Sequence, residues 1–149
     1  MMRNRFLLAL LTLTIFASGF AVGRLSLMPG EAPVQAQSQK RVFELRTYTT
    51  NEGKLDALQS RFRRHTMRLF EKHGMTNVGY WIPEEAPLAQ NTLIYIISHP
   101  SREAAKKNWA GFGSDPEWKR AARESEAGGK IVSKVDSVFM GATDYSPLR

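Results

Sequence analysis

The hydrophobic residues from position 41 to position 143 fall into segments with strand or helix spacing, and the order of these segments constrains the fold most. Runs rich in β-branched and aromatic residues predict strands at 41–50, 75–84, 92–98 and 131–143. Apolar residues three and four apart predict helices at 54–73 and at 101–127, the second in two pieces separated at Gly111 and Gly113. This order predicts an α+β fold, a ferredoxin-like βαββαβ antiparallel sheet with its helices on one face.

The alternation of residues in the first strand predicts how that sheet is covered. Successive side chains point to opposite faces, so one face carries Phe43, Leu45 and Thr47 and the other carries Glu44, Arg46 and Tyr48. We expect the first and third strands to be central and the apolar set to meet the helices. The polar set then lies on the helix-free face, beside apolar residues of other strands. Because exposed apolar surface usually marks an interface, we predict a homodimer with two sheets face to face around a barrel-like interior.

Residues 1–36 have the pattern of an export segment that precedes one folded domain at 40–149. A short basic start is followed by 17 residues without a charge, Phe6–Val22. This arrangement is typical of a secretory signal, with Val34-Gln35-Ala36 as a cleavage site. It also reaches the lower length limit of an uncleaved membrane anchor, and the remaining alternative is a core helix. Either export interpretation makes the domain periplasmic or secreted, with the N-terminal segment as its only membrane contact.

Composition excludes several classes of chemistry. The 149 residues include no cysteine, which excludes disulfides, thiolate metal sites and a cysteine nucleophile. The net charge of +7 includes Arg3, Arg5 and Arg24 of the export segment, and the rest is ordinary surface charge, so we expect no nucleic-acid partner. No phosphate loop, dinucleotide fingerprint or nucleophile elbow is present, and the three histidines lack zinc-site spacing. We therefore expect no cofactor and no metal.

His65 is the sharpest single candidate for chemistry. It follows Phe62 by about one turn and lies at the edge of the stripe expected to face the sheet. There it could act as a general base, a haem ligand or a ligand contact. Its pocket would be completed by Tyr80 or Trp81 and by apolar residues of the third strand. The alternative is a boundary histidine that makes one hydrogen bond.

The polar set of the first strand is a second candidate site. Glu44, Arg46 and Tyr48 lie roughly 6–7 Å apart along one face of a strand. They could bind a small anionic or polar ligand inside a barrel. Alternatively, Glu44 and Arg46 pair with each other or across the dimer interface, because buried charges require partners. We favour this second, structural role at the dimer face.

Six short segments resemble the NIPSNAP domain, in order along residues 42–149. They are 43–48 (FELRTY), 53–55 (GKL), 71–74 (EKHG), 78–81 (VGYW), 115–118 (DPEW) and 145–148 (YSPL). The resemblance implies a ferredoxin-like protomer of the dimeric α/β-barrel superfamily. That superfamily includes cofactor-free monooxygenases, haem-degrading enzymes and dehalogenating or isomerising enzymes. The mitochondrial and vesicle-traffic roles associated with animal members are not carried over, because a single exported domain departs from their arrangement.

Two classes of function fit these features. The first is a dimeric module that binds a small molecule or a protein, which needs a pocket or a surface but no acid–base pair. The second is a cofactor-independent enzyme, monooxygenase-like or isomerase-like, that acts on a small apolar or aromatic metabolite. Its reactive set would be His65, Arg46 and Tyr48. We favour the binding module, and the sequence does not decide whether the chain is an enzyme.

Overall fold

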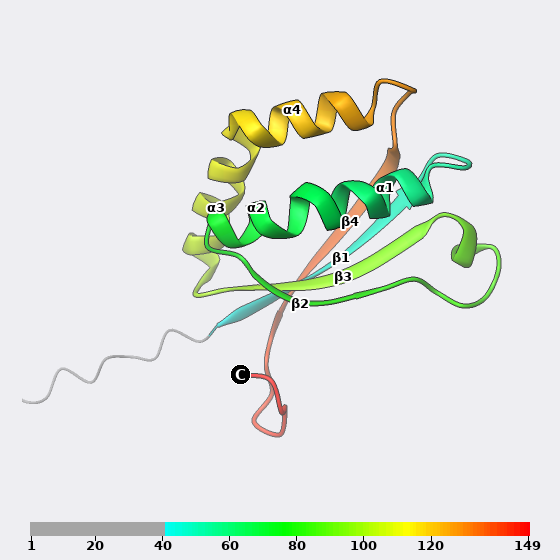
Figure 1. The fold of residues 1–149 in the computed structure, drawn as a ribbon. Coiled ribbons are helices and arrows are strands. Elements are labelled where there is room, and N and C mark those ends of the chain that lie inside the picture. The colour runs from blue at the N-terminus through cyan, green and yellow to red at the C-terminus, as the bar shows by residue number, and fades with distance from the viewer. Residues whose placement is uncertain (1–40) are drawn as a thin grey trace, which may run out of the picture. The chain divides into compact units, whose positions relative to one another are not determined.

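The structure is a computed structural model that describes residues 41–149, and the expectations for residues 1–36 lie outside the described residues. Strands and helices follow one another in the predicted order (Figure 1). The elements are β1 (Val42–Thr50), α1 (Leu55–Arg61), a π-helical turn η1 (Phe62–Thr66), α2 (Met67–Lys72), β2 (Thr76–Trp81), a 3₁₀ turn η2 (Leu88–Gln90), β3 (Thr92–His99), α3 (Arg102–Ser114), α4 (Pro116–Ser125) and β4 (Val132–Gly141). No helix in this part of the chain has the length and apolar character needed to cross a membrane.

The four strands form one antiparallel sheet in the order β2-β3-β1-β4. The first and third strands are therefore central, as predicted. The helices lie on one side of this sheet (Figure 1). This topology confirms the predicted α+β, ferredoxin-like fold, and β2 and β4 form its two edges.

The first helical stretch carries the predicted apolar stripe, but its middle is wound more loosely than an α-helix. Leu58, Phe62 and Leu69 are buried in the core. The Phe62 ring meets the Tyr95 ring of β3 edge-on, with centroids 5.2 Å apart. At the end of η1 the Met67 N–H donates to the Phe62 carbonyl, which is the i to i+5 bond of a π-helix. Residues within this turn are therefore rotated away from the positions that an unbroken α-helix would give them.

The second helical segment breaks one turn later than predicted. We expected Gly111 and Gly113 to end its first piece, but α3 continues through both glycines to Ser114. The break comes at Asp115, because Pro116 disfavours helical backbone in the residue before it. Gly111 instead allows close packing, since a Cβ there would lie 3.0 Å from Nδ1 of the His73 ring. Asp115 then caps α4 by accepting a hydrogen bond from the Glu117 N–H.

The predicted orientation of β1 is wrong. Glu44, Arg46 and Tyr48 face the helices, and Phe43, Leu45 and Thr47 lie on the helix-free face. The alternation shows which side chains share a face but not which face the helices cover. The buried charge is tolerated because the helix layer and neighbouring strands supply hydrogen-bond donors to it. The polar set is therefore not the dimer-face set that we expected.

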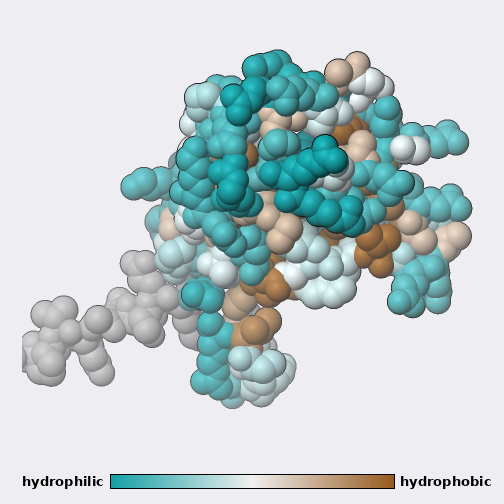
Figure 2. All heavy atoms as spheres, viewed as in Figure 1, coloured by the Kyte–Doolittle hydropathy of each residue, from teal (hydrophilic) through white to brown (hydrophobic). Residues whose placement is uncertain are grey.

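The middle of the helix-free face is apolar, and polar residues such as Asp136 and Lys134 lie toward one end of it. Its central row consists of Leu45, Ile96 of β3 and Val138 of β4, and Val138 is 55% exposed. Phe43 is buried at one end of this face, where the C-terminal segment contributes Leu148 to a cavity of about 250 Å³ beside it. In Figure 2 hydrophilic residues cover the helix layer, and hydrophobic ones emerge below it on the sheet side. We call this surface the helix-free face below.

Candidate functional site

A cavity of about 310 Å³ opens between the first helical stretch and the β2 edge of the sheet. Its walls are mainly apolar, with a guanidinium and an amide at the helix side. The lining residues are Gln59, Phe62, Arg63, Met67, Tyr80, Trp81, Ile82 and Leu93. We call this cavity the sheet-edge pocket. Its place between helix and sheet is the one predicted, and so are Tyr80, Trp81 and the contribution of β3 through Leu93.

The π-helical turn supplies one wall of this pocket. Phe62 and Arg63 belong to the turn, and Met67 follows it directly. The Thr66 hydroxyl donates to the Arg61 carbonyl at 3.3 Å, which satisfies an acceptor in this distorted part of the helix. The Arg63 guanidinium donates to the Gln59 side-chain oxygen at 2.9 Å and keeps further donors at the pocket. π-helical turns are rare and occur frequently at functional sites, so this wall favours a functional role for the pocket.

Tyr80 forms the polar part of the opposite wall. Its hydroxyl donates to the Asn77 side-chain oxygen at 2.5 Å, and its ring stacks on Tyr95 with centroids 5.4 Å apart. Burial raises the pKa of Tyr80 well above its ordinary value, and the nearby Glu71 carboxylate adds to this effect. The phenol is therefore protonated at neutral pH. It can act as a hydrogen-bond group but not as a base.

Trp81 lines the same pocket from the rim. Successive residues of a strand point to opposite faces, so Tyr80 lies under the helices and Trp81 on the helix-free face. Both contribute because β2 is an edge strand and the pocket extends to that edge. The Trp81 ring is 51% exposed and lies over Gly79, where a Cβ would come within 2.5 Å of the ring. Gly79 therefore makes room for the indole.

His65 does not share the sheet-edge pocket, which corrects our expectation for that residue. It lines a different cavity of about 260 Å³, between η1 and α4, together with Arg61 and Arg64. The cause is the π-helical turn, in which each residue rotates through a smaller angle than in an α-helix. Three residues after Phe62, the chain has turned His65 toward α4 and away from the sheet. We call this second space the interhelical cavity.

The polar set of β1 forms a buried network under the helices. Glu44 is 1% exposed, and its carboxylate accepts hydrogen bonds from Arg46 at 2.6 Å, Trp109 at 2.7 Å, Ser137 at 2.7 Å and His99 at 3.1 Å. Burial alone would raise the pKa of Glu44. The hydrogen bonds from His99, Ser137, Trp109 and Arg46 outweigh burial and hold the pKa at about 2. The carboxylate is thus ionised and fully occupied within the protein.

The same contacts occupy the other members of the network. His99 receives a hydrogen bond from the Asn108 amide at Nδ1 and donates from Nε2 to Glu44, so both ring nitrogens are used. The Arg46 guanidinium lies 4.3 Å from the centroid of the Trp109 ring and 5.5 Å from that of Tyr48. These contacts hold α3 against β1. The network stabilises the fold and offers no free base.

The folded part of the chain matches one family model from residue 43 to residue 147, that of NIPSNAP. The chain belongs to the NIPSNAP family. This confirms the resemblance drawn from the six short segments. No curated protein matches the sequence significantly.

Solved NIPSNAP structures share the fold. A family member of unknown function from Agrobacterium tumefaciens is 21% identical, with a TM-score of 0.64, and the match covers 74% of this chain and 96% of that one. A NIPSNAP-like domain protein from Burkholderia xenovorans is 16% identical, with a TM-score of 0.63, covering 73% and 90% of the two chains. SnoaB, a cofactor-independent oxygenase from Streptomyces nogalater, is 16% identical, with a TM-score of 0.50, covering 72% and 98%. At these identities the likeness concerns the fold.

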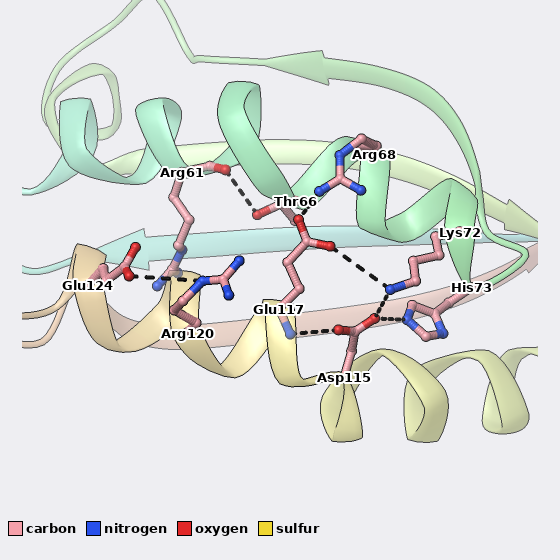
Figure 3. A network of polar contacts seen from close by, with 9 residues as sticks. All are labelled: Arg61, Thr66, Arg68, Lys72, His73, Asp115, Glu117, Arg120 and Glu124. Atoms are coloured by element: carbon pink, nitrogen blue, oxygen red, sulfur yellow. Dashed lines mark hydrogen bonds and ion pairs between the residues drawn. The ribbon is translucent and has the colours of Figure 1, made fainter.

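The NIPSNAP segment 115–118 lies at the joint between the helices. Asp115 accepts hydrogen bonds from Lys72 at 2.7 Å and from the Glu117 N–H at 2.7 Å, and its other contact is the His73 ring at 2.7 Å (Figure 3). The hydrogen bonds from Lys72 and His73 hold the pKa of Asp115 well below its usual range. Arg68 pairs with Glu117 beside them. Asp115 therefore has two structural roles, because it caps α4 and also anchors the C-terminus of α2.

Sequence reasoning missed the helix-side wall of the sheet-edge pocket and the partners of Glu44. Arg63 and Met67 gave no signal, because a π-helical turn cannot be distinguished from an α-helix by apolar spacing. The sequence did not link Trp109 to the first strand, although the indole N–H of a buried tryptophan usually finds an acceptor. The need for an acceptor near Trp109 was the signal that could have placed Glu44 under the helices. Within residues 41–149, no three histidine, aspartate or glutamate side chains gather to hold a metal ion.

Proposed function

We propose that this NIPSNAP chain is an exported, homodimeric binding module that holds a small apolar molecule in the sheet-edge pocket. The observation that carries the proposal is the pocket itself, about 310 Å³ in volume, with apolar walls and few polar groups. Sites for small molecules in proteins have this character, and their volumes run from about 300 to 1,000 Å³. The pocket is at the small end of that range, so its ligand is small.

The lining defines the chemistry of that ligand. The apolar surface of the pocket comes mainly from Phe62, Met67 and Leu93, and the Tyr80 ring offers a flat face on which a ligand can stack. Arg63 carries a positive charge at the rim and is only partly engaged by Gln59. The ligand that fits is an apolar, flat or aromatic molecule with one anionic or oxygen-rich group directed at Arg63.

The sheet-edge pocket has no general base in its lining, which favours binding over catalysis. Among its eight lining residues none is a histidine, an aspartate or a glutamate. Its only ionisable groups are an arginine and a tyrosine with a raised pKa, and neither accepts a proton at neutral pH. His65, the base we had considered, lines the interhelical cavity instead.

The alternative is a cofactor-independent enzyme, and one observation favours it. A solved protein with a related fold, SnoaB, is a cofactor-independent oxygenase. Such a reaction on this chain needs a base at the substrate. Oxygen uptake by the purified protein distinguishes the two functions. Uptake that requires the bound small molecule and is lost in Met67→Trp, which fills the pocket, would favour the enzyme over the binding module.

The proposed dimer rests on the helix-free face. An apolar surface that includes Leu45, Ile96 and Val138 is costly to leave in water. A second copy presents the same surface, and a twofold axis places the two faces against each other.

Export is supported by the sequence of residues 1–36. Fractionation of the natural host and N-terminal sequencing test it, with Gln37 as the expected first residue after cleavage.

Native mass spectrometry of the full-length protein, purified from its own cell envelope in mild detergent, tests the binding function. We expect a bound small molecule that travels with the wild-type protein and is absent from Met67→Trp, which fills the pocket.

With anilinonaphthalene sulfonate as probe, Arg63→Gln should weaken binding about fivefold, since an exposed charge contributes about 1 kcal/mol. Arg64→Gln is the matched control, because the adjacent arginine lines the other cavity. Equal probe affinity in all three variants would contradict the proposal.

A further inference from the structure

The interhelical cavity differs from the sheet-edge pocket in its chemistry. It measures about 260 Å³ and lies between α1, η1 and α4. Polar groups dominate its lining, with two arginines, a histidine, two serines and a glutamate. Ala57 and Ala121 contribute the only other surfaces, and their small side chains leave the space open. A concave site lined by several hydrogen-bond donors is unusual for a plain helix–helix contact, which packs apolar residues.

Arg61 is the buried element of this cavity. Its side chain is 5% exposed, and Nη1 donates to Glu126 at 3.2 Å and to Ser125 at 3.4 Å. Its Nε–H is buried without an acceptor among the described residues. Glu126 is 37% exposed, so its attraction for the buried cation is screened by solvent, and the guanidinium also lies 5.3 Å from the centroid of the Trp118 ring. Figure 3 shows Arg61 reaching from the first helix toward α4, beside Arg120 and Glu124.

The charges at the cavity favour an anion. Arg61 and Arg64 contribute two positive charges, and Glu124 and Glu126, the partner of Arg61, contribute two negative charges. Glu124 is already shared with Arg120, at 4.0 Å on the surface of α4. Arg120 adds a third positive charge, so three guanidinium groups stand against two carboxylates, and the N–H donors exceed the acceptors in number.

The donors also come from several directions. Arg64 and His65 belong to the π-helical turn, and Ser60 and Arg61 precede it. Arg61 reaches across the cavity to Ser125 on α4, whose hydroxyl accepts from Arg61 and donates to the Ala122 carbonyl. A tetrahedral oxyanion, which has three or more acceptor oxygens, uses such a spread of donors better than a planar carboxylate does. Because the cavity is larger than a phosphate alone, it has room for a small substituent on one oxygen.

We propose that the interhelical cavity is a second binding site, specific for a phosphate monoester, with Arg61 and Arg64 as its anion-binding residues. His65 adds a hydrogen bond to a phosphoryl oxygen. The site is separate from the sheet-edge pocket, and the two cavities flank the same π-helical turn. Arg63 serves one of them and Arg64 the other.

Calorimetric titration of the full-length protein in mild detergent tests this site, with glycerol 3-phosphate as ligand and glycerol as its uncharged counterpart. We expect saturable binding of the ester with a Kd of about 1 mM or below, and no binding of glycerol. Arg64→Gln should weaken binding about fivefold, since Arg64 is exposed like Arg63, and His65→Gln should weaken it by a smaller factor. Arg63→Gln, one residue away, should change it less than twofold.

Several outcomes would overturn the site. They are the absence of saturable heat, binding of glycerol as tight as that of the ester, and full affinity in Arg64→Gln. Arg61→Gln is informative only if it folds, because Arg61 also joins the first helix to α4, so Arg64→Gln carries the test. The proposed function fails separately, through Met67→Trp and Arg63→Gln, so the two proposals are distinguishable.

Discussion

The two faces of the sheet carry opposite chemistry. On the helix-covered face, Glu44 is 1% exposed and engaged by four donors from β1, β3, β4 and α3. On the helix-free face, Val138 is 55% exposed among apolar neighbours. The face with a charge at its centre is buried within the protomer, and the apolar face is left at its surface. Burial here follows the supply of hydrogen-bond partners as well as hydrophobicity, because a satisfied carboxylate is tolerated under helices.

The largest expected effect comes from breaking the network at its centre. Glu44→Ala leaves Arg46 buried without its carboxylate and leaves the Trp109 indole N–H without an acceptor. Removing one partner of a buried ion pair costs about 3–5 kcal/mol. Urea unfolding of the full-length protein should report that loss. Glu52→Ala, an exposed glutamate in the turn after β1, is the control and should change stability by less than about 0.5 kcal/mol.

Acid should remove the same stabilisation gradually. The pKa of Glu44 is lowered from 4.5 to about 2 in the folded state, so the unfolded chain takes up a proton at higher pH. The contribution of Glu44 is complete above about pH 4.5 and is lost as the pH falls toward 2, an effect of roughly 3 kcal/mol. Unfolding measured from pH 7 to pH 2 should show it. In Glu44→Gln the stability should fall less over this range, and an identical pH profile would contradict the assignment.

A substitution on the helix-free face should change dimer formation and leave the stability of the protomer unchanged. Val138→Glu places a charge in the apolar part of the helix-free face and should raise the dimer dissociation constant about thirtyfold, or about 2 kcal/mol. Light scattering measures the oligomer, and circular dichroism should show an unchanged fold. Val135→Glu is the matched control, because Val135 is 43% exposed on the same strand but opposite Tyr48, on the helix-covered side. Dissociation by both variants, or by neither, would argue against this interface.

The fold could be predicted almost completely, because period and order specify strands, helices and topology. The orientation of β1 could not, since the choice depended on donors such as Trp109 and Ser137, which are distant in sequence. If Arg46 lay at the dimer face, as we expected, its replacement by alanine would loosen the dimer. With Arg46 under the helices, its removal should destabilise the protomer instead. For the candidate site, Tyr80 and Trp81 were accessible from strand alternation, whereas His65 was misplaced by a π-helical turn that leaves no signal in apolar spacing.

The smallest effect tests whether the donors to Glu44 act as a set. Ser137→Ala removes one hydrogen bond of 2.7 Å to the carboxylate, and hydrogen bonds to charged groups contribute about 1.5–3 kcal/mol. Ser137 lies on the edge strand and is partly solvated, so we expect the low end, about 1.5 kcal/mol. Ser133→Ala is the control on the same strand, because its hydroxyl donates to the neutral Thr49 carbonyl at 2.9 Å. It should cost about 0.5–1 kcal/mol.

A double-mutant cycle distinguishes a bond to the charge from local packing. In the Glu44→Gln background, Ser137→Ala should cost much less than in the wild type, while the cost of Ser133→Ala should not change. The single variant Ser137→Ala should also raise the pKa of Glu44, because one of the hydrogen bonds that stabilise the ionised form is gone. Its acid-unfolding midpoint should therefore lie at higher pH than that of the wild type. Equal costs of Ser137→Ala in both backgrounds would mean that the serine stabilises β4 itself and not the buried carboxylate.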